Sequence, residues 1–154
     1  MKKKVTMILM SLFLAMMMVM PVSAEEISQD ISESEISETI SATNYFTGMT
    51  GTMNSLYGAE STRYPITSPS MSTGNPSVTK VTLTVTKKAS SANFYIYVKS
   101  PSGTVENQLV TSSGTYYFNT EFDNEDPEGT WYVWIRSVSG IATATARFRV
   151  DYTY

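Results

Sequence analysis

The sequence predicts an all-β domain, an antiparallel β-sandwich with a jelly-roll-like arrangement of about seven strands. Residues 130–138 alternate between two sets of large side chains, and several other short runs alternate in the same way. Clusters of Pro, Gly and Ser separate these runs, and no helical pattern is convincing after residue 62. Short alternating strands joined by regular turns are typical of sandwiches.

The run at residues 130–138 is the strand around which the predicted domain is organised. Successive side chains of a strand point to opposite faces, which gives two sets of three: Trp131, Val133 and Ile135 on one face, and Tyr132, Trp134 and Arg136 on the other. Both tryptophans of the chain lie here, and large aromatic side chains bury the most apolar area. Bulky groups on both faces predict a central strand, covered at least in part on each side.

Six other runs are also predicted to be strands: residues 64–67, 78–87, 94–99, 105–110, 115–119 and 141–154. Pro65 restricts the first of these to a sheet edge, because proline has no N–H to donate. Ser139 and Gly140 form a tight connection between the last two strands. We therefore expect residues 130–138 and 141–154 to pair as the strongest hairpin of the domain.

Residues 1–24 have the organisation of a secretory signal peptide. Three lysines at positions 2–4 precede an apolar run at residues 5–20, and small residues end the segment at Ala24. A transmembrane anchor is the alternative, but a spanning helix needs ~20 apolar residues. We expect cleavage after Ala24, no membrane span afterwards, and a product that is secreted, either extracellular or loosely associated with the cell surface.

Residues 25–61 differ in composition from the rest of the chain. Residues 25–43 are rich in Ser, Glu and Ile, which predicts a solvated tether, with a helix bearing isoleucines on one face as the alternative. Residues 44–61 combine glycines with aromatic residues. We expect a loop or a weak edge strand there, and an exposed docking surface is the alternative. The predicted sandwich domain then spans residues 62–154.

The composition excludes several classes of function. The chain has no cysteine and no histidine, so disulfides, His/Cys metal sites and histidine-based catalytic triads are impossible. Loss of the three lysines of the signal peptide changes the net charge from −3 to −6, and Arg147 and Arg149 are the only tight basic pair near the end. We expect no nucleic-acid partner, since two residues do not make a basic patch. No G-x-S-x-G motif occurs, and we expect no enzymatic activity.

Two segments carry recognisable motifs: NFYIYVKSPSGT at residues 93–104 and EDPEGTW at residues 125–131. The first resembles the D-L-x-I-x-L-x-S-P-x-G-T strand and turn, and the second the G-x-D-x-N-G-x-W turn, of P domains. These are the β-sandwich modules that follow the catalytic domain in kexin/furin-type and some bacterial secreted proteases. The resemblance covers about residues 62–154. It implies a jelly-roll sandwich with a stabilising role. Asn93 and Glu128 depart from the Asp and Asn of the family, so its calcium sites are not carried over.

An acidic loop between the predicted strands holds candidate metal ligands: Asp123, Glu125, Asp126 and Glu128. Carboxylate oxygens packed this closely are ligands that calcium accepts. The spacing of an EF-hand is absent, however, and a solvated turn is the alternative. No other cofactor is expected.

Four aromatic side chains form a candidate ligand platform: Tyr95, Tyr97, Tyr132 and Trp134. If Trp131 and Phe94 point into the core, these four point away from it together. Rings on one sheet face can bind sugars or an apolar partner, unless a second layer, such as residues 44–61, covers them.

These observations predict a secreted, non-catalytic β-sandwich module that binds or stabilises an extracellular protein or a cell-surface glycan. A carbohydrate-binding module that uses its outward aromatic residues is one alternative, and a small secreted hydrolase is another.

Overall fold

The computed structural model of the chain describes residues 43–71 and 74–154, so the predicted signal peptide and most of the predicted tether lie outside it. The described residues form nine strands and no helix, so none of their segments is a helix that could cross a membrane. The strands are β1 (Thr43–Met49), β2 (Met53–Leu56), β3 (Tyr64–Thr67), β4 (Ser77–Lys87), β5 (Phe94–Lys99), β6 (Val105–Val110), β7 (Gly114–Phe118), β8 (Thr130–Ser137) and β9 (Ile141–Thr153).

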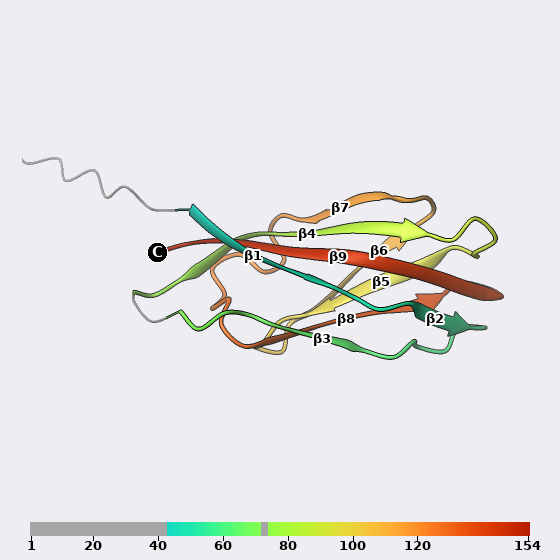
Figure 1. The fold of residues 1–154 in the computed structure, drawn as a ribbon, viewed down its shortest axis with the longest axis horizontal. Helices are drawn as coiled ribbons and strands as arrows, with labels where there is room; N and C mark the ends of the chain where they lie inside the picture. The colour runs from blue at the N-terminus through green and yellow to red at the C-terminus, as the bar shows by residue number, and fades with distance from the viewer. Residues whose placement is uncertain (1–42, 72–73) are drawn as a thin grey trace, which may run out of the picture. The chain divides into compact units, whose positions relative to one another are not determined.

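The strands form two antiparallel sheets. One sheet has the order β1-β9-β4-β7, with β2 pairing with β9 next to β1, and the other has the order β3-β8-β5-β6 (Figure 1). The predicted antiparallel all-β fold is therefore confirmed. Each of the seven predicted strands is present, and β8 lies inside its sheet, between β3 and β5, as its two bulky faces indicated.

The predicted pairing of residues 130–138 with residues 141–154 is wrong. β8 pairs with β3 and β5, whereas β9 pairs with β1, β2 and β4, so the turn at Gly140 carries the chain from one sheet to the other (Figure 1). Both strands have one strongly apolar face, and both faces are buried in the same core. The crossover lets these faces lie opposite each other, which side-by-side pairing in one sheet does not allow.

In the described part of the chain, strands of the sandwich are present from Thr43 onward, well before the boundary predicted at residue 62. β1 pairs with the C-terminal half of β9 and β2 with its N-terminal part, which accounts for the two strands beyond the seven expected. Phe46 and Met53 are buried, so both strands contribute to the core. Gly48 allows β1 to approach the other sheet, because a Cβ at this position would lie 2.5 Å from Ile66.

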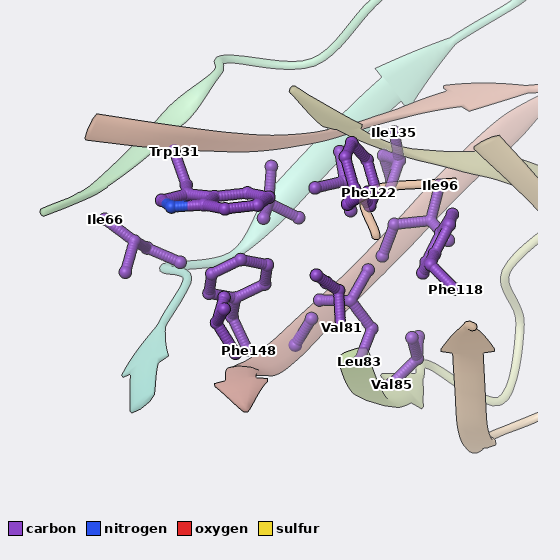
Figure 2. Packing of buried hydrophobic residues seen from close by; sticks show 14 of the residues in the cluster. Ile66, Val81, Leu83, Val85, Ile96, Phe118, Phe122, Trp131, Ile135 and Phe148 are labelled. Carbon is purple, nitrogen blue, oxygen red and sulfur yellow. The ribbon is translucent and has the colours of Figure 1, made fainter. Parts of the chain in front are cut away.

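The core lies between the two sheets and is rich in aromatic rings. The Trp131 indole is fully buried, with ring centroids 5.4 Å from Phe122 and 5.5 Å from Phe148 (Figure 2). Its Nε1–H donates a 3.0 Å hydrogen bond to the carbonyl of Pro127, so the polar atom of the indole is satisfied. The inward orientation of Trp131, Val133 and Ile135 agrees with the alternation of the sequence.

Candidate functional site

The four predicted platform residues lie together on the face of the β3-β8-β5-β6 sheet that is turned away from the core. On the neighbouring strands β5 and β8, Tyr97 is directly opposite Trp134 and Lys99 is opposite Tyr132. Tyr95 occupies the next outward position of β5. The two-residue period of the strands thus brings the four rings onto one surface.

Trp134, however, offers no free ring face to a ligand. Its ring stacks on Tyr97 with centroids 5.1 Å apart and an angle of 9° between the planes. From the other flank of β8, the Arg63 guanidinium lies 4.4 Å from the centroid of the Trp134 ring. Only 2% of Trp134 remains exposed, compared with 39% of Tyr95. Trp134 is therefore a covered side chain, and the expectation that it forms part of an open platform is corrected.

The groups around Trp134 also include an exposed ion pair. Arg63 contacts Glu60 at 2.8 Å, and this hydrogen bond is the main reason that the pKa of Glu60 lies below its usual value, against the opposing effect of desolvation. The indole N–H of Trp134 contributes to the same lowering of the pKa. It is buried and makes no hydrogen bond of ordinary geometry within the described residues.

An exposed apolar surface lies at one end of the sandwich, where β2 ends and the turn from β8 leads into β9. We call this surface the apolar end; it consists of Leu56, Tyr57, Val138 and Ile141. Leu56 is directly opposite Ile141, and the Tyr57 N–H donates to the carbonyl of Gly140. More than half of each of the four residues is exposed, and Tyr57 reaches 81%.

Tyr57 is held in an unusual backbone conformation. Its φ of 46° lies in the left-handed region, which bulky side chains rarely adopt. Such a conformation persists only where the surrounding structure enforces it, and it is enriched at functional sites. The strained backbone here presents the most exposed aromatic ring among the described residues.

A shallow groove of about 260 Å³ adjoins the apolar end. Its lining comes from the β2–β3 connection, β5, β8 and the following turn: Gly58, Tyr95, Tyr97, Arg136, Ser137 and Val138. The Arg136 Nε–H donates to the Gly58 carbonyl at 2.7 Å, which holds the connection against the sheet. Val138 belongs to both the groove and the apolar end, so the two surfaces are continuous.

Buried hydroxyl groups hold β2 and the connection from β2 to β3 against β8. The Ser61 Oγ accepts a 3.0 Å hydrogen bond from the Ile135 N–H, and the Ser55 Oγ accepts one of 2.7 Å from the Ser137 N–H. In this way two side chains satisfy N–H groups of β8 beyond Val133, the last β8 residue in the ladder with β3.

The predicted metal ligands do not converge. Glu125 accepts hydrogen bonds from the hydroxyls of Ser102, at 2.7 Å, and Thr104, whereas an Asp126 carboxylate oxygen accepts from the Glu128 N–H at 2.9 Å. Asp123 is exposed. Within residues 43–71 and 74–154, no three Asp, Glu, His or Cys side chains are grouped so that they could hold a metal ion.

The contact between Glu125 and residues 102–104 joins the two segments that resemble P domains. A Cβ at Gly129 would lie 2.8 Å from the Pro101 side chain, so the proline ring packs close to the Gly129 backbone. Burial works against ionisation of Glu125, but hydrogen bonds from Ser100, Thr104 and Ser102 outweigh it and hold the pKa of the carboxyl below its usual value.

Sequence reasoning placed the aromatic rings on one face but missed the apolar end. Its four residues come from the end of β2 with the turn after it and from the turn after β8 with the start of β9. These segments are far apart in the chain, and none of the four residues belongs to a motif. Only the Leu56-Tyr57 pair gave a signal, as two large apolar residues between glycines.

Comparison with known proteins assigns no family. No family model matches the chain, and no curated protein matches it. Among solved structures, the crystal structure of FLHE aligns with a TM-score of 0.45 and 16% identity, over 74% of this chain and 98% of that one. A likeness of this size does not establish a relationship.

Proposed function

We propose that this protein is a secreted, non-catalytic β-sandwich module that binds an extracellular protein through its apolar end. The observation that carries the proposal is the grouping of Leu56, Tyr57, Val138 and Ile141, all more than half exposed, beside a groove. Contiguous exposed apolar surface with a polar border is typical of protein interaction sites.

The chemistry of the site favours a protein partner with an apolar projection. The tyrosines of the groove and Tyr57 supply rigid aromatic area, and Tyr and Arg are enriched where interfaces derive most of their affinity. Arg136, at the border of the groove, can also donate hydrogen bonds to a carboxylate of the partner, since Arg has several N–H donors and, among the described residues, only its Nε–H is used. A stabilising role for a neighbouring protein also agrees with the resemblance to P domains.

Carbohydrate binding is the second candidate. A sugar ring stacks on the open face of an aromatic side chain, and Tyr95 is the most exposed of the four platform residues. The coverage of Trp134 by Tyr97 and Arg63 weakens this alternative, because the largest ring of the surface has no free face.

The test uses a photo-crosslinking amino acid at position 57, introduced into the chain from Glu25 onward and incubated with the extracellular proteins of the producing cells. Tyr117, which is 47% exposed on the other sheet, is the matched control position. We expect one partner to be crosslinked from position 57 and not from position 117. The purified partner should then bind the unmodified protein, and Val138→Asp should abolish this binding.

Two results would contradict the proposal. Equal crosslinking from positions 57 and 117 would show that the apolar end has no special role. Saturable binding to a neutral glycan that Tyr95→Ala abolishes and Val138→Asp does not would instead support the carbohydrate-binding alternative.

A further inference from the structure

The opposite side of the sandwich carries a surface of a different kind. On the outward face of β1, β9 and β4, the structure has two grooves. The first, about 270 Å³, is lined by Tyr45, Thr47, Thr82, Thr84, Arg147 and Arg149. The second, about 330 Å³, is lined by Thr52, Thr86, Lys88, Thr143, Ala144 and Thr145.

The two grooves follow each other along the same two strands. Arg147 of the first groove is directly opposite Thr84, and Thr145 of the second is opposite Thr86, the next outward position of β4. We call this continuous surface the threonine-arginine face. From Lys80 to Lys88 the chain advances eight residues, which is roughly 27 Å of extended strand. The face is therefore long enough for several units of a linear polymer.

The charge on this face is opposite to that of the protein as a whole. Its outward positions and groove linings carry four cations: Lys80, Lys88, Arg147 and Arg149. Asp151 is the one acidic residue at the outward positions of β1, β4, β7 and β9. It pairs with Arg149, whose guanidinium also lies 4.0 Å from the centroid of the Tyr45 ring. The chain without its signal peptide has a net charge of −6, so a cationic surface on it is unexpected.

Two further features make the face suitable for an extended ligand. Arg147 is exposed and is in neither of the two ion pairs found among the described residues, so its guanidinium is available to a ligand. Around it, the threonine side chains present hydroxyls, which both donate and accept hydrogen bonds. Hydroxyl groups interleaved with cations match a polymer that itself alternates hydroxyls with anions.

We propose that the threonine-arginine face binds a linear anionic polysaccharide, with Arg147 and Lys88 contacting successive acidic groups of the polymer and the threonines contacting its hydroxyls. The acidic groups can be uronate carboxylates or phosphodiesters, because both accept charge-assisted hydrogen bonds from Arg and Lys. Nucleic acid is less suitable, since the grooves contain one aromatic ring, Tyr45, and Arg149 occupies a face of it.

The experiment uses titration calorimetry at two salt concentrations and the chain from Glu25 onward. Four polymers are tested: polygalacturonate, a poly(glycerol phosphate) glycopolymer, neutral dextran and double-stranded DNA. The test variant is Arg147→Ser combined with Lys88→Ser. The matched control combines Lys99→Ser with Arg63→Ser, which removes the same charge from the other sheet. Circular dichroism and thermal melting establish that each variant is folded.

We expect binding to at least one of the acidic polysaccharides, no binding to dextran, and weakening as salt is raised. The test variant should bind roughly tenfold more weakly, and the control should bind like the wild type. If only one of the two acidic polymers binds, the result identifies the acidic group that the face recognises: carboxylates for polygalacturonate and phosphodiesters for the poly(glycerol phosphate) polymer. Unchanged binding by the test variant, an equal loss in the control, or equally tight binding of DNA would each overturn the proposal.

Discussion

The Tyr97 ring lies parallel to the indole of Trp134, with the ring centroids 5.1 Å apart and the planes within 9° of each other. The two residues are directly opposite on the adjacent strands β5 and β8, where cross-strand aromatic pairs stabilise a sheet. With Arg63 on its other flank, Trp134 forms a small packed cluster outside the main core. β8 is thus covered on both faces at this position.

Trp134→Ala should therefore destabilise the domain, by about 2–3 kcal/mol in the free energy of unfolding. This is below the ~3–5 kcal/mol typical of a Trp→Ala change in a closed core, because water can fill the space on the outer face. Tyr95→Ala, on the same face but 39% exposed, is the control and should cost less than about 1 kcal/mol. Urea unfolding measures both values. Equal, small effects would show that the Trp134 cluster contributes nothing to stability.

Trp131→Ala should be the most damaging single change in β8, at about 3–5 kcal/mol. It removes a fully buried indole that packs on Phe122 and Phe148, and it leaves the carbonyl of Pro127 without its donor. Against a typical total of ~5–15 kcal/mol, most of the stability can be lost. Trp131→Phe keeps part of the ring contact, so its free energy of unfolding should lie between those of the wild type and Trp131→Ala. A melting temperature near that of the wild type for Trp131→Ala would contradict this assignment.

Ser61→Ala should cost about 1–3 kcal/mol, because the buried N–H of Ile135 loses its acceptor. The matched control is Ser139→Ala, since Ser139 is exposed. Amide hydrogen exchange gives a local readout. The Ile135 amide should exchange faster in Ser61→Ala than in the wild type, and its exchange rate should not change in the control. Unaltered protection of Ile135 would mean that water or another group replaces the hydroxyl.

Because of Glu125, the free energy of unfolding of the domain should depend on pH in the acidic range. Its pKa in the folded protein is lowered, so the carboxylate contributes stability that is fully present above the unfolded value of about 4.5 and is lost as the pH falls through the folded value. Glu125→Gln should lower stability at neutral pH and flatten the acid side of the pH profile. Removal of two donors, Ser102→Ala with Thr104→Ala, should have the same effect. A profile that keeps its shape in both variants would contradict the role of these hydrogen bonds.

The secreted protein should begin at Glu25. The predicted cleavage site follows small residues that end at Ala24, after a basic start and an apolar run. Expression of the whole chain with its own N-terminus, followed by mass spectrometry of the protein in the medium, checks this. Substitution of Ala24 by a bulky residue should reduce processing. Intact chains that remain in the membrane fraction would favour the anchor alternative.

The pattern of the sequence determined which side chains of a strand share a face. Trp131, Val133 and Ile135 form one such set, and the alternating apolar residues of β9 around Phe148 form another; both sets are inside the core. In β8 both sets are bulky, so only the structure shows which one is buried. The same period groups Tyr95 with Tyr97 and Tyr132 with Trp134, and the pairing of β5 with β8 brings the two pairs onto one surface. For residues 44–61 the pattern indicated only a loop or a weak edge strand, since β1 contains a glycine and has one buried residue and β2 has only four residues.

Only the tertiary structure decided which strands are neighbours and what covers them. Alternation specifies a face but not a partner, so β8 and β9, adjacent in sequence, could not be assigned to different sheets. The same limit applies to the candidate sites: Arg63 covers Trp134, and residues 102–104 bind Glu125, through contacts between distant parts of the chain. The apolar end exists for the same physical reason, because folding brings together residues that have no local pattern in common. The threonine-arginine face has a local pattern within β4 and within β9, but only the pairing of these strands makes it one surface.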